Sequence, residues 1–442
     1  MFGENENNSH TVKMDSIVPY TCLFIDADWR DYVEATSSCV RCGTNRTKVI
    51  DDINSLWVNE NNRNSVLPCL SVRSGLDLYL KVMNFPPGSE VIMSAINIPD
   101  MVTVVKHHNL KVVPLDINIE TTGPKVELLP SLVTDKSVAI LVAHVFGKWC
   151  DMDPVIAAAQ QYGLVVIEDC AEAFCGFERL GDPRSDIALF SFGVIKYLTA
   201  FGGAIAKVKN DSVFSKMAKL YETRDVQSRW EYFKKTCKCL TVFLALACPC
   251  VSQTIMYLCR CCNLDHKQVF VKMLRGFPDQ MLKKIKLQPS TQLLMMVRKR
   301  FRDFREADYN IGTVKGEYVR MRLPEDVQLV GMKAKVNNYW LFPILVENPD
   351  TILSYLNAFG VDAYRGATQL NIIEPEQESG KNPETQLDPR YPTEARYLID
   401  HVIYLPVHKK VPFHALNKIC KAVSQAIQMS KDSPKVRLQS KL

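Results

Sequence analysis

The sequence predicts an α/β protein with a large domain built on a mainly parallel, doubly wound sheet and a smaller C-terminal α/β domain. Between about residues 67 and 209, short apolar and β-branched runs alternate with stretches of helical, amphipathic spacing. These runs mostly lack polar alternation, as expected of strands covered by helices on both faces. With 442 residues, of which 47% are apolar and 23% charged, the chain can bury a large core.

The elements of the large domain follow one another as βαβ units. The expected strands are Val91–Ser94, Lys111–Asp116, Ala139–Phe146, Leu164–Asp169, Ile187–Phe192 and Ala204–Val208. The expected helices are Leu76–Met83, Met101–His108, Asp153–Tyr162 and Ser212–Arg224. Pro154 stands in the first turn of the third helix, behind Asp153 as its predicted cap. Ligands of such sheets collect at the carboxyl ends of the strands, where loops and helix amino termini converge.

A second α/β unit is expected from Asn337 onward. Its strands are Trp340–Val346 and His401–Leu405, its helices are Thr351–Phe359 and Phe413–Met429, and Asn371–Glu394 is predicted to be a surface loop. We therefore divide the chain into an N-terminal extension (1–66), a large domain (67–335), a small domain (336–430) and a polar tail (431–442). An apolar insertion interrupts the large domain at about 236–262.

Composition and charge narrow the function classes. Lys and Arg exceed Asp and Glu by 6, which suits anionic ligands or a membrane surface but does not indicate a nucleic-acid binder. The 15 cysteines are expected to be reduced thiols, because residues 1–15 have no apolar signal-peptide core. A cytoplasmic location is the resulting expectation. Cys39 and Cys42 form a single pair without a second pair at finger spacing, so no metal site is predicted.

Two carboxylates, Glu168 and Asp169, end one predicted strand abruptly. A strand-end aspartate is more often a helix cap or a solvated loop residue, so it decides nothing by itself. The next strand ends near Ser191 and is followed by Lys196, by the glycine pair Gly202–Gly203 and by a further strand. An acid and a lysine beyond neighbouring strand ends, followed by paired glycines, form a more specific pattern.

This combination resembles the DegT/DnrJ/StrS sugar-aminotransferase family. The resemblance rests on Glu168-Asp169-Cys170-Ala171-Glu172, Ser191-Phe192 with Lys196, Gly202-Gly203, Pro87-Gly88-Ser89-Glu90-Val91-Ile92, Ala143-His144-Val145-Phe146-Gly147, Asp151-Met152-Asp153, Tyr339-Trp340-Leu341-Phe342-Pro343 and Leu405-Pro406-Val407-His408. It runs from about residue 67 to 428 and is weak between 210 and 335. It implies the fold-type-I architecture of pyridoxal-phosphate (PLP) transferases.

The resemblance also implies roles for individual residues. Lys196 would carry the cofactor as a Schiff base and then move the substrate proton, and Asp169 would keep the pyridine nitrogen protonated. Ala171 and Glu172 would lie beside the ring and His144 near its other substituents. Ser191, at the strand end, is included among the cofactor-binding residues. His and Glu also commonly serve as packing or surface groups, which stays open for both.

The cofactor phosphate is expected at the amino terminus of the helix that starts near Ser71. Relatives carry Ser-Gly-Thr-Ala-Ala-Leu here, whereas this chain has Ser71-Val72-Arg73-Ser74-Gly75-Leu76. Ser71, Arg73 and Ser74 are the predicted phosphate ligands, and Arg73 can pair with the phosphate directly. Ile98 replaces the aromatic that often stacks on the ring, and Lys284-Ile285-Lys286 resembles the partner-subunit Asn-x-Arg clamp. These departures leave open a relative that has lost turnover.

The segment Leu240–Cys259 holds twenty residues without a charge, enough to span a bilayer. A single crossing is excluded if the flanking regions form one fold, and Pro249 breaks any helix near the midpoint. A shallow hairpin in one leaflet is one alternative, favoured by the basic stretch 266–305 and by nearby cysteines that can carry acyl chains. A helical pair buried in the core or in a dimer interface is the other.

The sequence thus predicts a homodimeric, PLP-dependent aminotransferase. It would convert a keto group of a nucleotide-linked or cyclitol-like sugar to an amine, with glutamate or glutamine as donor. The substrate class is inherited from the resemblance alone. One alternative is a PLP-dependent dehydratase, against which Lys196 speaks because such relatives often replace the lysine. The other is a membrane-associated scaffold that keeps the fold without the chemistry.

Overall fold

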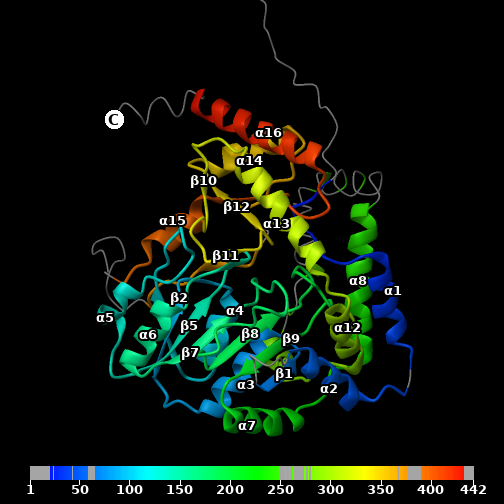
Figure 1. Ribbon diagram of the computed structural model, residues 1–442, viewed down its shortest axis with the longest axis vertical. Coiled ribbons are helices and arrows are strands. Elements are labelled where there is room, and N and C mark those ends of the chain that lie inside the picture. Colours follow the sequence, from blue (N-terminus) through cyan, green and yellow to red (C-terminus); the bar gives the residue numbers. More distant parts are fainter. Residues whose placement is uncertain are drawn as a thin grey trace, which may run out of the picture.

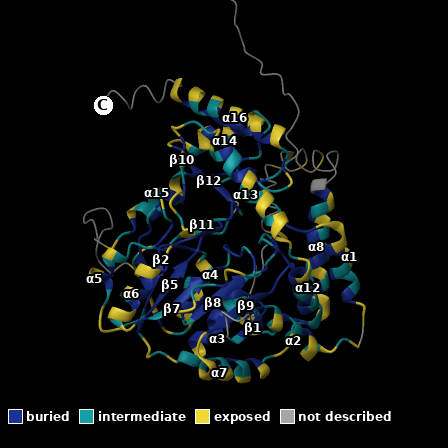
Figure 2. Ribbon diagram, in the orientation of Figure 1, coloured by how far each residue is buried: buried dark blue, intermediate teal, exposed yellow. Residues whose placement is uncertain are grey.

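The computed structural model describes residues 20–22, 24–41, 43–57, 65–247, 254, 258, 261–262, 273–274, 277, 280–366, 368–376 and 390–432. A large α/β unit carries a smaller one, which ends in the long C-terminal helix (Figure 1). Buried residues gather on the strands and on the inner faces of the surrounding helices (Figure 2).

Seven strands form the central sheet, in the order β1-β9-β8-β7-β5-β2-β4. They are β1 (Ser65–Cys69), β2 (Glu90–Ser94), β4 (Lys111–Leu115), β5 (Ser137–Ala143), β7 (Val165–Asp169), β8 (Ile187–Ser191) and β9 (Ala204–Val208). The five strands β8, β7, β5, β2 and β4 are parallel to one another, and β9 runs antiparallel between β8 and β1. The mainly parallel sheet is confirmed. The unpredicted strand β1 contains Pro68, which a sheet tolerates at an edge position.

Helices cover both faces of this sheet. They are α3 (Val72–Met83), α4 (Pro99–His107), α5 (Leu129–Leu132, after a 3₁₀ turn at Val126–Leu128), α6 (Asp153–Tyr162) and α7 (Asp211–Glu222). Val91 of β2 packs with α3, α4 and α7, whereas its neighbour Ile92 packs with α5 and α6. Successive side chains of a strand point to opposite faces, so a strand covered twice must be apolar throughout.

Two local expectations are wrong. β5 ends at Ala143 rather than at Phe146, because Phe146 (φ 61°) and Gly147 (φ 78°) adopt left-handed conformations that turn the chain. Asp153 is the first residue of α6 and not its cap, since Met152 holds the cap position without a side-chain hydrogen bond. Pro154 stays in the first turn, where its missing N–H is tolerated.

The described part of the expected N-terminal extension packs into the large unit. α1 (Trp29–Ser38) and α2 (Arg46–Trp57) lie beside α8 (Arg229–Ala247) and α12 (Thr291–Arg302) (Figure 1). Trp57 is fully buried, with its ring centroid 5.1 Å from that of Phe190, and Tyr32 lies 4.8 Å from Phe201. These aromatic contacts join the N-terminal helices to the core beside β8 and β9, while the proposed domain boundaries remain a prediction.

The apolar segment 240–259 begins inside α8. Cys239 and Val242 of this helix are buried in the cluster that contains α1 and α12, whereas Leu244 is exposed. Positions 248–253, 255–257 and 259, with Pro249 among them, lie outside the described residues. Of the helices in the described ranges, none combines the length and the apolar character that crossing a membrane requires.

The smaller unit is an antiparallel sheet, β10-β12-β14, with helices packed on it. Its elements are α13 (Glu306–Arg320), β10 (Gln328–Leu329), β12 (Phe342–Leu345), α14 (Pro349–Ala358), α15 (Thr393–His401), β14 (Val402–Leu405) and α16 (Phe413–Asp432). β12, α14, β14 and α16 confirm the four elements expected there. Val319 and Val327 belong to the hydrophobic core of this unit, although both precede residue 336, where the small domain was predicted to begin. The short helix α11 (Met281–Lys284), earlier in the chain, packs in the core of the large unit.

Two short strand pairs join the units. β6 (Lys148–Trp149) pairs with β11 (Val336–Asn337), and β3 (Ile96–Asn97) pairs with β13 (Asn371–Ile372). The prediction of a surface loop is therefore wrong at residues 371–372, and also at 393–394, where α15 begins. The strand forms because Ile373, which follows it, is buried against the large unit. Residues 377–389 of the predicted loop lie outside the described residues.

Candidate functional site

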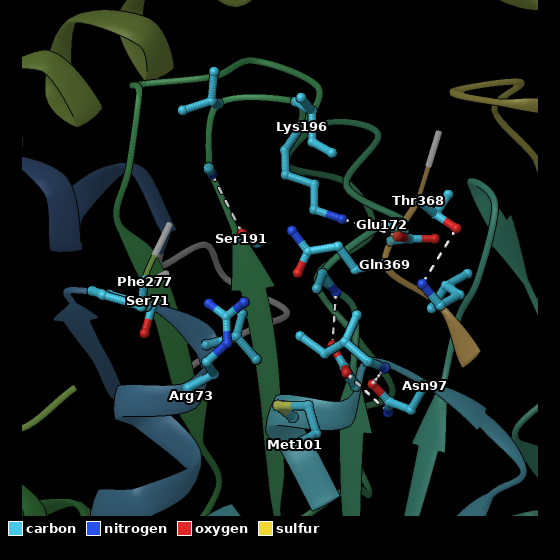
Figure 3. A pocket seen from close by; sticks show the side chains of 18 of the residues that line it. Ser71, Arg73, Asn97, Met101, Glu172, Ser191, Lys196, Phe277, Thr368 and Gln369 are labelled. Atoms are coloured by element: carbon cyan, nitrogen blue, oxygen red, sulfur yellow. Dashed lines mark hydrogen bonds and ion pairs between the residues drawn. The ribbon is translucent and has the colours of Figure 1, made fainter. Parts of the chain in front are cut away.

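A cavity of about 130 Å³ lies at the carboxyl ends of β5, β7 and β8 (Figure 3). Its walls include eight of the residues predicted to act in catalysis or cofactor binding: Ser71, Arg73, His144, Asp169, Ala171, Glu172, Ser191 and Lys196. The ninth, Ser74, lies behind Ser71, with the two hydroxyl oxygens 3.0 Å apart. The smaller unit contributes Thr368, Gln369 and Leu370. Residues from distant parts of the chain thus converge at the sheet edge that the fold class indicates.

Lys196 extends from the loop after β8 toward Glu172 (Figure 3). Its Nζ lies 3.0 Å from Glu172 Oε1 and 4.5 Å from the ring centroid of Trp340. The other Glu172 carboxylate oxygen accepts the backbone N–H of Phe146 at 3.0 Å. The amine is therefore aimed by an anion on one side and by an aromatic face of the smaller unit on the other.

Asp169 is the last residue of β7, and its carboxylate is buried. Its Oδ1 accepts the backbone N–H of Ala171 at 3.1 Å, and its Oδ2 accepts Asn97 Nδ2 at 3.3 Å. Burial raises the pKa of Asp169, against the opposing effects of these bonds and of the Lys196 charge. Asn97, on β3, was not predicted from the sequence, because its approach depends on how β3 lies against β7.

The opposite end of the cavity lies at the amino terminus of α3. Ser71 is the cap residue of this helix, and its hydroxyl accepts the Ser74 N–H at 3.2 Å. Arg73 Nε lies 2.8 Å from Asp100 Oδ2, and its guanidinium carbon is 5.5 Å from the ring centroid of Phe277. A hydroxyl, a guanidinium and a helix amino terminus at one place make this end attractive to an anion.

His144 forms part of the cavity wall, but its polar atoms are engaged elsewhere. Its Nε2 lies 2.9 Å from Glu168 Oε2, its Nδ1 accepts the Cys150 N–H at 3.3 Å, and its ring packs 4.6 Å from that of Trp149. His144, Glu168 and Cys170 hold possible metal donor atoms within 4.8 Å of one another. Because this histidine and this glutamate already bond to each other, we keep the prediction that the site holds no metal.

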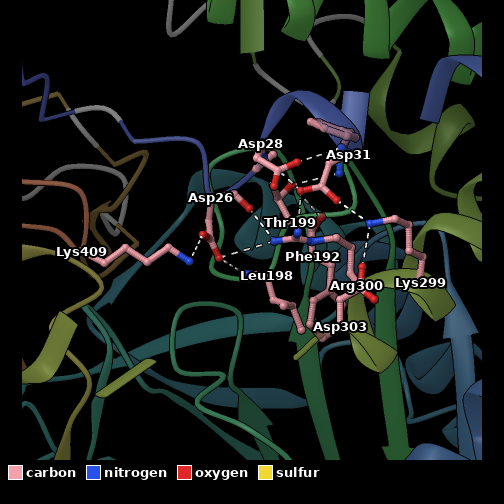
Figure 4. Close-up of polar contacts among 12 residues, drawn as sticks. Asp26, Asp28, Asp31, Phe192, Leu198, Thr199, Lys299, Arg300, Asp303 and Lys409 are labelled. Atoms are coloured by element: carbon pink, nitrogen blue, oxygen red, sulfur yellow. Dashed lines mark hydrogen bonds and ion pairs between the residues drawn. The ribbon is translucent and has the colours of Figure 1, made fainter. Parts of the chain in front are cut away.

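A buried ion-pair network supports the loop that carries Lys196 (Figure 4). Asp26 Oδ2 accepts the N–H of Leu198 at 2.8 Å, and its Oδ1 lies 2.6 Å from Lys409 Nζ in the smaller unit. Arg300 of α12 donates to the Asp26 carbonyl and to Asp31 Oδ2, each at 2.6 Å. The N-terminal segment thus connects the lysine loop with both units. Sequence reasoning missed it, since no motif marks these residues.

Two of the noted departures take definite places. Ile98 lines the cavity beside Asn97. Ile285, at the centre of the resemblance to the partner-subunit clamp, is buried in the core, and among described residues the cavity lining includes neither Lys284 nor Lys286. Lys235 of α8 lines the cavity instead. It lies in the region of weak resemblance, so only the fold could reveal it.

Comparison with known proteins bears on this site. Residues 63–239 match the DegT/DnrJ/EryC1/StrS aminotransferase family. The resemblance inferred from the sequence motifs is thus confirmed over this stretch, which includes both Asp169 and Lys196.

Curated relatives match over a similar stretch. GDP-perosamine synthase of Caulobacter vibrioides is 31% identical over 153 residues, covering 34% of this chain and 41% of that protein. Spore coat polysaccharide biosynthesis protein SpsC of Bacillus subtilis is 30% identical over 149 residues, covering 33% and 38%. The chain therefore spans about two fifths of the length of the curated relatives it matches.

Solved structures resemble nearly the whole chain. NtdA of Bacillus subtilis, solved with bound cofactor PMP, superposes with a TM-score of 0.65 at 15% identity, covering 95% of this chain and 86% of that one. An aminotransferase from Psychrobacter cryohalolentis gives a TM-score of 0.64 at 15% identity, covering 93% and 99%. The fold is therefore that of the fold-type-I transferases, as predicted.

Proposed function

We propose that this protein is a PLP-dependent aminotransferase that converts a keto group of a sugar, nucleotide-linked or cyclitol-like, to an amine. Glutamate or glutamine is the proposed donor. One observation carries the proposal: the Lys196 amine and the buried Asp169 carboxylate line a single cavity. The family match over residues 63–239 includes both and supports it.

The residues of the cavity fit PLP. The lysine amine can react with the aldehyde of PLP, and the carboxylate, whose pKa is raised by burial, can pair with the ring nitrogen. The helix amino terminus flanked by Ser71 and Arg73 can hold the phosphate. When bound, PLP supplies an aldehyde that accepts an amine and a ring that withdraws electrons from the carbon losing its proton.

The residues of this chain have separable roles in that chemistry. Asp169 would hold a protonated ring nitrogen by charge, and ionising it beside a cation relieves the unfavourable burial of its carboxylate. Lys196 would move a proton to or from the substrate carbon, because its amine lines the cavity and is the one that the family resemblance assigns to this step. Glu172 positions that amine at 3.0 Å, and the ring of Trp340 lies against it from the side of the smaller unit.

The test is covalent labelling of the lysine. Full-length protein incubated with PLP is expected to turn yellow, and borohydride reduction should fix the cofactor on Lys196, as read by peptide mass spectrometry. Lys196→Ala should remain unlabelled. Lys209→Ala is the matched control, because Lys209 is an exposed lysine whose amine donates to the carbonyl of the exposed residue Arg184. Protein that stays colourless with added PLP would refute the proposal and favour the non-catalytic scaffold.

A panel of amino donors addresses the reaction itself. Incubation of the yellow protein with glutamate or glutamine should shift its absorption to that of the amine form of the cofactor. Keto sugars linked to a nucleotide should then restore the original spectrum. Release of the substrate hydroxyl as water, with no amine gained, would indicate the dehydratase instead.

We propose a homodimer in which the segment Lys284–Lys286 of one subunit approaches the site of the other. Its support is negative: the segment resembles an interchain clamp, yet among the described residues its lysines do not line the cavity of their own chain. Sedimentation equilibrium tests the assembly. In mixed dimers, Lys196→Ala paired with a Lys284→Ala, Lys286→Ala subunit should keep about half of the wild-type activity, because the intact lysine of one subunit meets the intact segment of the other; loss of nearly all activity would place the segment at the site of its own chain. A monomer at micromolar concentration would contradict this proposal.

Peripheral membrane contact of a cytoplasmic protein is a further proposal. Trp29 and Val33 on α1, Val40 just beyond its end and Leu244 on the adjacent α8 are exposed apolar residues, and Leu244 belongs to the apolar segment 240–259. Flotation with anionic liposomes should recover the full chain but not a Trp29→Ser, Val33→Ser, Leu244→Ser variant. Equal flotation of the two would remove the proposal, and a buried helical pair would remain for segment 240–259.

A further inference from the structure

The α3 end of the cavity carries more positive charge than its described surroundings neutralise. Arg73 and Lys235 both line it, and Asp100, itself partly exposed, pairs with Arg73 at 2.8 Å. Within the described ranges, Lys235 Nζ makes no hydrogen bond or ion pair. An amine facing a cavity beside a guanidinium is a costly arrangement unless an anion joins the two.

Electrostatics supports the same conclusion. Burial lowers the pKa of the Lys235 amine; the nearby Cys239 opposes this shift, and the Arg73 charge adds to it. Burial also lowers the pKa of the Arg73 guanidinium. Each cation is therefore less favourable here than in water, and a dianion placed between them would relieve both effects.

The two glycines before β9 let the Lys235 amine lie close to the backbone of the loop. A Cβ on Gly202 would lie 3.3 Å from Lys235 Nζ, so the absence of a side chain lets the amine approach the loop closely. Gly203, with φ 86°, accepts a conformation that strains other residues. The first turn of α3, beginning at Val72 and capped by Ser71, points its N–H groups at the same end.

The position of Lys235 is fixed by contacts one turn before and one turn after it on α8. One turn earlier, the Tyr232 hydroxyl donates to the Ala200 carbonyl at 3.0 Å, which ties the helix to the loop between Lys196 and the glycine pair. One turn later, Cys239 is buried against α1 and α12. The amine is thus delivered to the cavity by a fixed helix rather than by a surface loop.

We infer that Lys235 and Arg73, together with the first turn of α3, form an anion subsite that a single chain supplies and that binds a phosphate group. The inference rests on the proposed function, because the two phosphate sources it allows are the PLP phosphate and the diphosphate of a nucleotide-linked sugar. It assigns to α8 a binding role that no sequence motif indicated. It also places the cation for the phosphate within the same subunit as Lys196.

The experiment measures binding rather than turnover. Cofactor-free, full-length protein is titrated calorimetrically with inorganic phosphate, PLP, pyridoxal and UDP. Lys235→Gln should weaken phosphate binding about ten-fold or more, the size expected for losing one charge-assisted bond. Lys235→Arg should retain it. Lys238→Gln is the matched control, since Lys238 is exposed one turn further along α8.

Comparing the ligands shows whether the subsite binds the phosphate of PLP or the diphosphate of the substrate. Weaker binding of PLP with unchanged binding of pyridoxal supports the subsite and assigns it to the cofactor, whereas a loss confined to UDP supports it and assigns it to the substrate. Unchanged binding of phosphate, PLP and UDP in Lys235→Gln overturns the inference, provided that its circular dichroism matches the wild type. Because inorganic phosphate needs no reactive lysine, this result stands apart from Lys196 labelling, which tests the enzyme itself.

Discussion

Replacing Arg300 with methionine tests whether the N-terminal segment is an integral part of the fold. Arg300 is buried on α12 and donates two 2.6 Å hydrogen bonds, to Asp31 Oδ2 and to the Asp26 carbonyl. Removing one partner of a buried pair costs about 3–5 kcal/mol, because the remaining charge is left uncompensated. We expect about 3 kcal/mol, the lower end, since Lys299 still pairs with Asp31 at 2.8 Å.

Urea titration followed by tryptophan fluorescence and far-ultraviolet circular dichroism gives the free energy of unfolding. Arg302→Met is the control on the same helix. Arg302 is mostly exposed and pairs with Asp52 at 3.1 Å, so its loss should cost below about 1 kcal/mol. A double-mutant cycle with Asp31→Asn should reveal a coupling of about 1 kcal/mol or more. If Arg300→Met and Arg302→Met destabilise the protein equally, the network in Figure 4 does not hold the segment in place.

Three further predictions concern single positions. Gly147→Ala should destabilise the protein by about 2–3 kcal/mol and lower its soluble yield, because φ is 78° there and the new Cβ would lie 1.8 Å from Asn338 Oδ1; a urea midpoint equal to wild type would contradict this. Burial alone would raise the pKa of Asp31, but its contacts with Arg300 and Lys299 together lower this pKa by more, so the net shift is downward. Its stabilisation is present above the unfolded pKa of about 4 and disappears as the pH falls through the folded value, so unfolding of Asp31→Asn should depend less on pH between 5 and 3. Burial raises the pKa of Asp169 in the folded protein. The protonated carboxyl therefore contributes stability below about pH 4, and this stability is lost as the pH rises through the folded pKa. Cofactor-free Asp169→Asn should therefore unfold at higher urea than wild type at pH 8 while losing transaminase activity, and equal or lower stability would speak against a strained carboxylate.

Much of the site could be predicted because its residues belong to short, local patterns. Asp169 and Ser191 end apolar strands, and parallel strands that end together deliver such residues to one edge. Ser71 begins a helix in the way that its side chain favours. Lys196 follows a strand end and precedes a glycine pair, so the resemblance to one family could assign it a place before any coordinates were known.

Other residues of the site could not be found in this way. Asn97 donates to Asp169 from β3, a two-residue strand that pairs with β13 in a segment predicted to be a loop. Lys235 lies on a helix whose sequence is basic and then apolar, which does not reveal the face turned to the cavity. Asp26 contacts Leu198 across 172 positions of the chain, and no local signal predicts a partner so distant.

Local periodicity and turn signals therefore determined the fold class and most elements, and the resemblance of short motifs to one family singled out the acid and the lysine of the site. The tertiary structure alone decided the path of the N-terminal helices, the antiparallel β9, the supporting role of His144 and the position of Lys235. The reason is physical. Backbone conformation depends on neighbours a few residues away, whereas burial, charge pairing and cavity lining depend on contacts between segments far apart in sequence, which form only when the layers pack.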